Sequence, residues 1–540
     1  MILSNENKKY TVLLIEPGED FSEKGCGVLA KQTPSLGLVS IATYLKRSFP
    51  QIFVKIIDQQ NQNSSLNARV ESYLHSFLKE ESPELVGIQS YSYNFLSACK
   101  TAKEVRSILP KAFIVLGGPH PSVVPKEVLD YCIEIDGAVV GEGEKVLEEL
   151  VETKDDPDSH EKYGFKRSID GLYTRHSSFV SRQPIEDLDS IPYPDWSVVQ
   201  YKQRYARAYS YKYRMMEFLF PISTSRGCCF NCQFCLSSYL SKNIRMRSPK
   251  SVIEEIIYNW ETYNARFFYF TDPNFLYDIN RAENICDLIR EEIYYKRNGR
   301  LSFRIQTRAN FDNEKILYKL RATGCELIFL GIESGDDKVL KYNKPGQTVK
   351  MVEKVVANIR RVGIRVKASF LLGLPFETEE SIQKTVSFIQ SLDLDDAAFH
   401  TLDVYPGTIL SEKVKTENYG GLYLDNSNEV CLPTVNQEKN EVCLPVVNIE
   451  KNEFQYSRNT PLYGVNDLTA KDLGETREKL SEMYPQLRRS RVREDILRKN
   501  LCELRYFLDW DSKVFDRILD EKIEKIKKVQ DYQRDFWLKS

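Results

Sequence analysis

The chain has 540 residues, a formal net charge of −2 and 12 cysteines. The nearly balanced charge excludes a protein whose main task is electrostatic binding of nucleic acid, because such proteins carry a marked positive excess. No stretch approaches the roughly 18 consecutive apolar residues of a membrane span, and the start, MILSNENKKYTVLLIEP, lacks a charged-then-apolar leader. We therefore expect a cytoplasmic protein with mostly reduced thiols, no membrane span and two to four domains, by the rough rule of 100–200 residues each.

The first 150 residues alternate short apolar runs with amphipathic segments, such as 38–49 and 97–109, that have helical spacing. The predicted strands cover 10–18, 53–58, 84–90, 112–118 and 136–144. Continuous apolar strands separated by helices predict a parallel sheet covered on both faces. The fold class is therefore α/β, beginning with a doubly wound, Rossmann-like domain whose ligand binds beyond the carboxyl ends of the strands.

Polar residues and glycines gather at these predicted strand ends. They are Gln89, Ser90, Gly117, Gly118, His120, Gly141, Glu142 and Gly143. Ordinary turn glycines are the alternative interpretation of any single loop. The grouping at one edge of the sheet favours a ligand site instead.

A second series of strands and helices begins near residue 220. The predicted strands are PISTSRG (221–227), 266–275, 301–310, 325–334, 365–375 and 396–406, with helices at 251–263, 313–323 and 348–362. Six strand–helix repeats predict a partial (β/α)6 or a full β/α barrel, whose working residues lie at the carboxyl ends of the strands. The segment IPYPDW (191–196) is the expected boundary between the two units.

The tail carries a tandem duplication: NEVCLPTVNQEK (428–439) is followed at once by NEVCLPVVNIEK (440–451). Repeat folds need about three copies, so we expect a duplicated surface loop with Cys431 and Cys443 as loop thiols, a shared metal site being the alternative. Beyond residue 467 the chain is charged and mainly helical, and the basic run at 488–493 is interpreted as a solvated helix face. The predicted domains are 1–190, 191–415 and 416–540.

The stretch TSRGCCFNCQFC (224–235) places four cysteines within eight positions. Cys228, Cys232 and Cys235 have the spacing C-x3-C-x2-C, and Cys229 falls outside it. A structural zinc site usually has four ligands in two separated C-x2-C pairs, and no such pair lies elsewhere in the chain. Three thiolates on one loop suit a cuboidal iron–sulfur cluster with one iron left open to chelate a small molecule.

This stretch resembles the cluster loop of the radical S-adenosylmethionine (SAM) superfamily. The resemblance implies a [4Fe–4S] cluster held by Cys228, Cys232 and Cys235, with Cys229 as a non-ligand. It also implies SAM on the open iron, cleavage of SAM to a 5′-deoxyadenosyl radical, sensitivity to oxygen, and an electron donor such as flavodoxin or ferredoxin. The protein would bind and orient these groups and exclude water.

The same resemblance implies a set of residues around SAM, on the segments FTDPNF, QTRAN and GIES. Phe234 would lie by the adenine, Asp272 would hold the amino group and Arg308 would pair with the carboxylate, as guanidinium suits bidentate recognition. Glu333 and Ser334 would complete the pocket. A simple Asp–Pro turn is the alternative for Asp272, whereas a purely structural Glu333 would bury an unpaired carboxylate.

The first domain resembles the cobalamin-binding half of cobalamin-dependent radical SAM enzymes, which include the anaerobic Mg-protoporphyrin cyclase and many methyltransferases. The segments that carry the likeness are PSLGLVSIATYL (34–45), GGPHPS (117–122), GEGE (141–144) and IPYPDW, and the two resemblances together span about 10–415. They imply that the strand-end set of eight residues given above binds cobalamin. The motif Asp-x-His-x-x-Gly, whose histidine ligates cobalt, is absent from this sequence, and we expect Gln89–Tyr93 to face the lower side of cobalt.

Three functions follow from these observations. The first is methylation of an unactivated carbon or phosphorus in a small molecule or lipid, with one SAM supplying the radical and another the methyl group. The second is radical cyclisation or rearrangement without methyl transfer. The third, a non-catalytic zinc or iron–sulfur module, leaves Asp272, Arg308 and the GIES segment unexplained.

Overall fold

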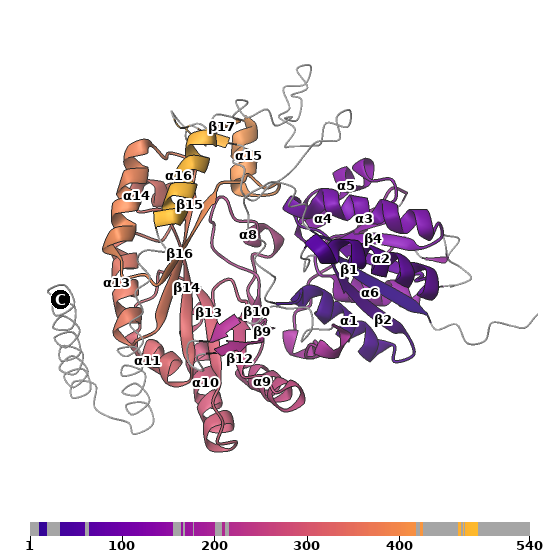
Figure 1. Ribbon diagram of the computed structural model, residues 1–540, viewed down its shortest axis with the longest axis horizontal. Coiled ribbons are helices and arrows are strands. Elements are labelled where there is room, and N and C mark those ends of the chain that lie inside the picture. The colour runs from indigo at the N-terminus through magenta and orange to yellow at the C-terminus, as the bar shows by residue number, and fades with distance from the viewer. Residues whose placement is uncertain are drawn as a thin grey trace, which may run out of the picture.

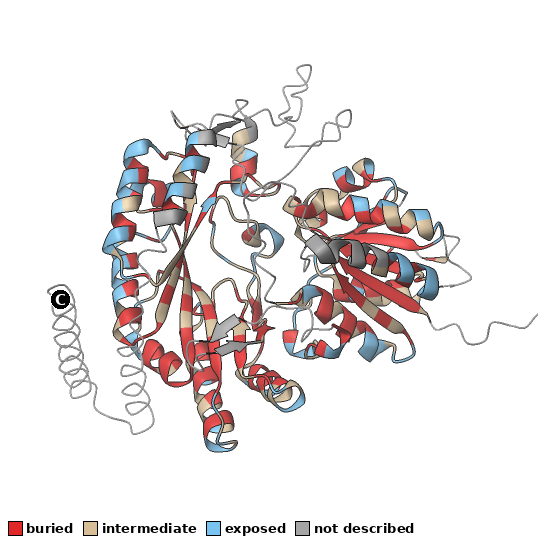
Figure 2. Cartoon of the chain, viewed as in Figure 1, coloured by how far each residue is buried: buried red, intermediate tan, exposed pale blue. Residues whose placement is uncertain are grey.

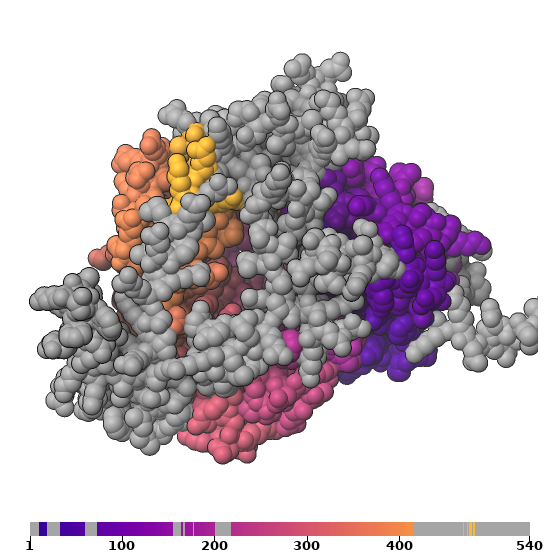
Figure 3. Space-filling model, viewed as in Figure 1, coloured from indigo at the N-terminus to yellow at the C-terminus, as the bar shows by residue number. Residues whose placement is uncertain are grey.

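The computed structural model contains two α/β domains joined by a linker (Figure 1). It describes residues 10–18, 33–59, 64–154, 164–165, 168–176, 178–199, 208–210, 215–416, 422–424, 463–465, 468 and 470–483. The first domain and the described barrel residues lie on opposite sides of the molecule in the space-filling view (Figure 3).

The first domain is built on a six-stranded sheet with the order β2-β1-β3-β4-β5-β6. Its strands are β1 (Thr11–Glu16), β2 (Phe53–Asp58), β3 (Leu85–Gln89), β4 (Phe113–Gly117), β5 (Gly137–Val139) and β6 (Leu172–Thr174). The first five strands are parallel, as the sequence predicts, and β6 runs antiparallel to β5. The sequence gives no expectation of β6, whose three residues are too short a run for a pattern.

Helices cover both faces of this sheet, so the doubly wound fold is confirmed. Its helices are α1 (Leu36–Ser48), α2 (Ser64–Glu81), η1 (Ser92–Asn94), α3 (Phe95–Ile108), α4 (Pro119–Val123), α5 (Pro125–Tyr131) and α6 (Gly143–Glu152). Alternate residues of β1 face opposite ways: Val12 and Leu14 pack in the core with α1 and α6, and Leu13 and Ile15 pack with α2, α3 and α5. Full burial on both faces explains why these strands read as continuous apolar runs.

The second domain is an open parallel sheet with the order β16-β15-β14-β13-β12-β9. Its strands are β9 (Leu219–Ile222), β12 (Phe267–Phe270), β13 (Ser302–Arg308), β14 (Cys325–Glu333), β15 (Arg365–Leu372) and β16 (Asp396–Thr401). Five of them fall within ranges that the sequence predicts, and β9 begins two residues before its predicted range. Because β9 and β16 form the two edges of this described sheet, the fold is the partial barrel rather than the full one.

The helices α9 (Pro249–Tyr263), α10 (Ile279–Leu288), α11 (Glu314–Ala322), α13 (Val349–Arg361) and α14 (Glu379–Ser391) lie on the outer face of the barrel, with their buried sides against the strands (Figure 2). The second domain also contains α8 (Ser237–Leu240), which lies on the side of the first domain, the π-helical turn η5 (Ile289–Tyr295), α12 (Asp337–Asn343), α15 (Ile409–Thr416) and α16 (Ala470–Met483). In α13, Val352, Val355, Val356 and Ile359 recur at helical spacing and are all buried. None of the described helices combines the length and apolar character needed to cross a membrane.

Short two-stranded pairings complete the described structure: β7 (Ala208–Ser210) with β8 (Met215–Glu217), β10 (Ser225–Arg226) with β11 (Arg245–Met246), and β17 (Leu422–Leu424) with β18 (Tyr463–Val465). The duplicated segment 428–451, with Cys431 and Cys443, lies between β17 and β18 and outside the described residues. Of the predicted helical tail, the structure describes α16, where Leu473 and Leu480 are buried in the barrel core. The basic run at 488–493 lies outside the described residues.

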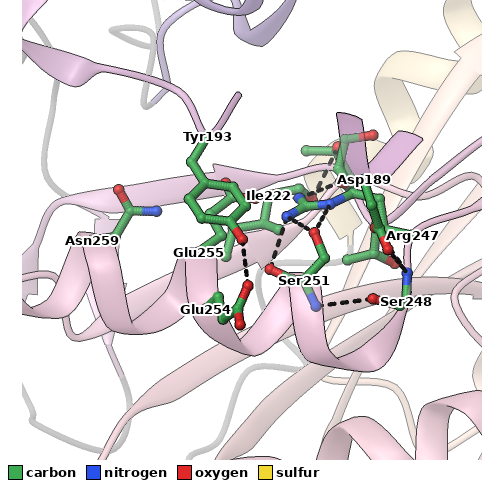
Figure 4. A network of polar contacts seen from close by, with 12 residues as sticks. Asp189, Tyr193, Ile222, Arg247, Ser248, Ser251, Glu254, Glu255 and Asn259 are labelled. Carbon is green, nitrogen blue, oxygen red and sulfur yellow. Dashed lines mark hydrogen bonds and ion pairs between the residues drawn. The ribbon is translucent and has the colours of Figure 1, made fainter. Parts of the chain in front are cut away.

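The linker contacts both domains and contains the 3₁₀ turns η3 (Leu188–Ser190) and η4 (Trp196–Val198). On the barrel side it lies along α9, where Tyr193 donates a hydrogen bond to Glu254 over 2.9 Å and Asp189 accepts one from the backbone of Ser248 (Figure 4). Trp196 is buried, and its Nε1 donates to Asn259 Oδ1 over 2.9 Å. The two domains are therefore held together through specific side chains.

Candidate functional site

The cluster loop, residues 224–235, follows the first barrel strand at its carboxyl end. Near the start of the loop, position 227 requires glycine. Gly227 has a φ of 97°, and a Cβ there would collide with the carbonyl oxygen of Asn243. The next residue is fixed as well, because Cys228 N donates to Ser241 O over 2.9 Å. The loop therefore starts from a rigid base at the barrel mouth.

The four cysteines of the loop have different surroundings. Cys232 is buried and Cys228 and Cys235 are half-buried, whereas Cys229 is exposed and interacts with Tyr277. Burial raises the pKa of Cys228 and of Cys232, so both thiols favour the protonated form in the absence of a metal. Bound iron reverses this preference, since a metal ion deprotonates a coordinating thiol. Three free thiols on one rigid loop fit the ligand set of a cuboidal cluster.

Arg308, at the carboxyl end of β13, lies against this loop. Its Nη1 is 2.9 Å from Cys232 Sγ, its Nη2 donates to Pro345 O over 2.9 Å, and its guanidinium lies 4.2 Å from the centre of the Phe230 ring. The structure thus brings Arg308 to the cluster loop, as the sequence predicts. Its contact in this structure is a cluster-ligand sulfur, and pairing with a SAM carboxylate stays a prediction.

Glu333 lies at the end of β14, the strand next to β13. It has a φ of 72°, which is unusual for a residue other than glycine, and the register of β14 against β15 shifts between Gly331 and Glu333. Its carboxylate is 2.8 Å from Lys344 Nζ, and the two side chains are 12% and 6% exposed. Glu333 is therefore paired, and Lys344 is a residue that the sequence did not indicate.

Two further predicted SAM residues, Asp272 and Ser334, make hydrogen bonds within the barrel domain. Both carboxylate oxygens of Asp272 are engaged by the start of the cluster loop, with Thr224 Oγ1 at 2.8 Å and a hydrogen bond from Ser225 Oγ. Ser334 is fully buried, and its hydroxyl lies 3.3 Å from Thr385 Oγ1. Burial raises the pKa of Asp272, against the effect of its hydroxyl partners. In this geometry Asp272 anchors the loop, and its contact with SAM stays a prediction.

Phe234 is the remaining predicted SAM residue, and it is partly buried against the barrel core. Phe234 lies on the loop that carries Cys232 and Cys235. Its expected contact with adenine stays a prediction.

A cavity of about 390 Å³ lies between the two domains. It begins in the first domain between β1 and β3, where β1 pairs with strands on both of its sides and the chain order reverses. Its walls are Leu14, Leu36, Gly37, Leu38, Ser40, Ile41, Gly87, Ile88, Gln89, Val115, Gly117, Gly118, Val139, Gly141, Glu142, Gly143, Glu144, Leu147, Leu188, Ile191, Pro192, Pro194, Ser223, Arg226, Arg247, Glu255 and Thr271. The expected ligand position at a strand-order reversal therefore coincides with a real cavity.

Glycines open this cavity in two ways. A Cβ on Gly37 would meet only the side-chain nitrogen of Gln89, at 4.0 Å, so this glycine leaves space for a ligand. Gly118 is required by the fold itself, because it has a φ of 116° and a Cβ would lie 2.6 Å from Ser90 O. At Gly143 a Cβ would lie 2.9 Å from the flexible tip of Ile41. Gly37 therefore leaves space for a ligand, whereas Gly118 is needed for its backbone conformation.

Six of the eight predicted cobalamin residues line the cavity: Gln89, Gly117, Gly118, Gly141, Glu142 and Gly143. Ser90 and His120 are not among its walls. Ser90 is buried and donates its backbone N–H to Gly117 O over 2.7 Å. His120 Nδ1 is 3.0 Å from Ser92 Oγ, and burial lowers the pKa of His120 to about 4, so its ring is neutral near pH 7.

Several cavity residues were missed by sequence reasoning, among them Gly37, Gly87, Glu144, Arg226 and Arg247. Gly87 had an identifiable sign, because a glycine inside an apolar strand often marks the close approach of a ligand. No sequence pattern indicated Arg226 and Arg247, because they belong to the barrel domain and line the cavity only through the arrangement of the two domains.

The cavity fits the nucleotide-bearing side of a corrin cofactor in its place and chemistry. It opens at the carboxyl ends of parallel strands and combines apolar walls with glycines that leave room. Beside it, the rings of Tyr91 and Tyr93 stack with centres 5.3 Å apart, and Gln89 Nε2 is 3.2 Å from Tyr91 Oη. The segment Gln89–Tyr93 therefore presents phenols, hydroxyls and an amide, and no imidazole.

A three-cysteine loop on a parallel barrel, next to a cofactor cavity in a doubly wound domain, defines a two-domain α/β enzyme with two neighbouring cofactor sites. Comparisons with known families agree. Residues 222–389 match the radical SAM superfamily, and residues 25–151 match the B12 binding domain.

Individual relatives extend the match across both domains. The chain is 30% identical, over 76% of its length and 84% of the relative's, to the "Uncharacterized methyltransferase PH0819" of Pyrococcus horikoshii. It is 28% identical to the anaerobic magnesium-protoporphyrin IX monomethyl ester cyclase of Cereibacter sphaeroides, over 63% of this chain and 54% of that protein. The fold resembles that of the radical SAM methyltransferase TsrM from Kitasatospora setae, with a TM-score of 0.59, 21% identity, and coverage of 78% and 81%.

The chain belongs to the radical SAM superfamily, in the group that carries an N-terminal B12 binding domain. It is a radical SAM enzyme. Membership implies a [4Fe–4S] cluster and SAM at the barrel mouth, and the first domain implies cobalamin.

Proposed function

We propose that this enzyme is a cobalamin-dependent methyltransferase that acts on an unactivated carbon or phosphorus of a small molecule or lipid. The observation that carries the proposal is the position of Arg226. Its side chain lines the interdomain cavity, and it lies two residues before Cys228 in the cluster loop. A corrin in the cavity would therefore lie close to the cluster, as sequential use of both cofactors requires.

When bound, the cluster and SAM would supply a 5′-deoxyadenosyl radical, and the corrin would supply a transferable methyl group. The chain's own residues bind and orient these groups. Cys228, Cys232 and Cys235 supply the thiolates, and the rigid base at Gly227 holds them in place. Arg308 and Lys344 put positive charge beside Cys232, which favours the electron-rich state of the site.

The first domain contributes space and exclusion of water. Apolar side chains from the strands β1, β3, β4 and β5, from α1 and α6 and from the linker form much of the wall, and Gly37 leaves room beside them. The segment Gln89–Tyr93, which we expect to face cobalamin, contains no histidine, and His120 lies 3.0 Å from its Ser92. The relatives named as methyltransferases support methyl transfer over other radical reactions.

The test is anaerobic reconstitution with iron, sulfide and hydroxocobalamin, followed by gel filtration and measurement of all three on one sample. SAM and a reducing protein such as flavodoxin or ferredoxin are then added. We expect retained cobalamin, 5′-deoxyadenosine, and S-adenosylhomocysteine from the methyl-donating SAM. A wild-type protein that binds the cluster and retains no cobalamin would contradict the proposal.

A second candidate is radical cyclisation or rearrangement without methyl transfer. The similarity to the magnesium-protoporphyrin cyclase favours it. The same experiment separates the two, because this reaction forms 5′-deoxyadenosine and no S-adenosylhomocysteine. Transfer of a labelled methyl group from SAM into product excludes the second candidate.

A further inference from the structure

Four charged residues connect the first domain to the cluster loop. Glu142 and Glu144 lie at the start of α6, and Arg226 and Arg245 face each other across the antiparallel pair β10 and β11. Arg226 is 2.6 Å from Glu144 and 3.1 Å from Glu142, and Arg245 is 2.8 Å from Glu142. We call this set the interdomain ion pairs.

The interdomain ion pairs are partly to fully buried and further hydrogen-bonded. The side chains of Glu144 and Arg245 are 5% and 7% exposed, and those of Glu142 and Arg226 are 20% and 25% exposed. Glu144 also accepts a hydrogen bond from Ser40 Oγ over 3.0 Å, and Glu142 accepts one from the backbone of Ile185 over 2.9 Å. Burial alone would raise the pKa of Glu142, but Arg245 and Arg226 outweigh it and lower that pKa. Breaking such a pair leaves a buried charge without its partner, which is costly.

The interdomain ion pairs face the cavity on one side and the cluster loop on the other. Glu142, Glu144 and Arg226 all line the cavity, next to Gly141 and Gly143. Between Arg226 and Cys228 lies only Gly227, where a Cβ would collide with the carbonyl oxygen of Asn243. A shift of the Arg226 backbone would therefore be passed to Cys228 through a single residue.

Resting on the proposed function, we propose that Arg226 is a positioning residue that couples occupation of the cavity to the placement of the cluster loop. A ligand in the cavity restricts Glu142 and Glu144, these hold Arg226, and Arg226 holds the base of the loop. Coupling between two binding sites is reciprocal, so a formed cluster must strengthen corrin binding as much as the corrin stabilises the cluster.

The test compares the affinity for hydroxocobalamin of cluster-free and cluster-loaded protein, by anaerobic equilibrium dialysis read by absorbance. We expect the loaded wild type to bind about tenfold tighter, within the usual range of such couplings. In Arg226→Met the ratio falls to about one. Arg226→Lys keeps the charge but cannot bridge two carboxylates in the same way, and is expected to give an intermediate ratio.

Lys46→Met is the matched control, because Lys46 also makes an ion pair with the linker, to Asp195 at 2.7 Å, away from the cluster loop. It is expected to keep the wild-type ratio. If Arg226→Met is not folded by circular dichroism, Glu144→Gln replaces it, since it removes the charge and keeps the size. An unchanged ratio in these variants, or a wild-type ratio of one, overturns this inference alone. Wild-type protein that binds no cobalamin in either form overturns the proposed function itself.

Discussion

The cluster loop and the interdomain cavity are built in opposite ways. The loop places reactive side chains close together along the chain, with four thiols from Cys228 to Cys235, three of them in the C-x3-C-x2-C spacing. The cavity is a space between residues of both domains that meet only in the folded protein, and at Gly37 of α1 the lack of a side chain adds to it. The cluster loop can be predicted from the spacing of its cysteines along the chain. The cavity cannot be predicted in this way, because it depends on how the strands and helices are arranged.

The cysteine ligands give the largest expected effect. Replacing Cys228, Cys232 or Cys235 by alanine removes one of three thiolates, exposes a second iron and leads to loss of the cluster. Cys229→Ala keeps it, since Cys229 is exposed and outside the register. The measurement is iron and sulfide per protein after anaerobic reconstitution. Loss of iron from Cys229→Ala equal to that of the other variants would show that the register is wrong.

The cavity can be filled without touching the loop, through Gly37→Leu. The new side chain enters open space at the start of α1, so we expect the affinity for hydroxocobalamin to fall by at least about 100-fold, which is about 2.7 kcal/mol. The cluster content is expected to stay at the wild-type level.

Gly37→Ala is the matched control, with a small effect on binding and a helix stabilised by roughly 0.5–1 kcal/mol. Gly118 is less suitable as a test, because any side chain there collides with Ser90 and perturbs the domain. Undiminished cobalamin binding by Gly37→Leu would place the cofactor outside this cavity.

Two carboxylates, Glu142 beside the cavity and Glu377 in the barrel domain, affect stability in opposite directions as the pH changes. The pKa of Glu142 is lowered, so its contribution to stability is present above its ordinary pKa and lost on acidification. Burial raises the pKa of Glu377, after β15, to about 8 from an ordinary value of 4.5. Its contribution is full below pH 4.5 and is lost as the pH rises toward 8.

We therefore expect Glu377→Gln, which cannot ionise, to be more stable than wild type at pH 8, by about 4 kcal/mol in the free energy of unfolding. The difference should shrink at about pH 5.5. Urea unfolding of cluster-free protein at both pH values measures it. Equal pH dependence of the two proteins would mean that Glu377 ionises normally in the folded state.

The smallest effect is expected at Arg308, whose guanidinium lies 2.9 Å from Cys232 Sγ. Arg308→Met removes a positive charge beside a cluster ligand, so the reduction potential should fall by roughly 50 mV, close to a tenfold change for one electron. A redox titration followed by electron paramagnetic resonance measures it, with Arg308→Lys as the charged control. An unchanged potential with weakened SAM binding would favour the contact with the SAM carboxylate instead.

The sequence predicted the parallel strands of both sheets, and not the antiparallel β6, because their apolar runs, as in β1 and β14, have the length and composition of buried parallel strands. It also indicated the edge of the first sheet where the cavity lies. It did not indicate the direction of individual side chains. Asp272 and Ser334 hydrogen-bond to Thr224 and Thr385 in this structure, and their contacts with SAM stay predictions. Lys344 and Arg226 contact their partners across the fold, and no local pattern reports such pairs.

The linker has a consequence for motion. Asp195 binds Lys46 of the first domain and Tyr263 of the barrel, at 2.7 and 2.9 Å, and the neighbouring Trp196 is only 1% exposed. A hinge at this point would have to break the contacts of Asp195 with both domains and uncover the buried Trp196, so we expect the two domains to keep one relative orientation through the catalytic cycle. The binding and release of small molecules, rather than domain opening, would then limit the rate of turnover. Slow hydrogen exchange at the amides of Val198 and Val199, with or without ligands, would be the sign of such a rigid frame.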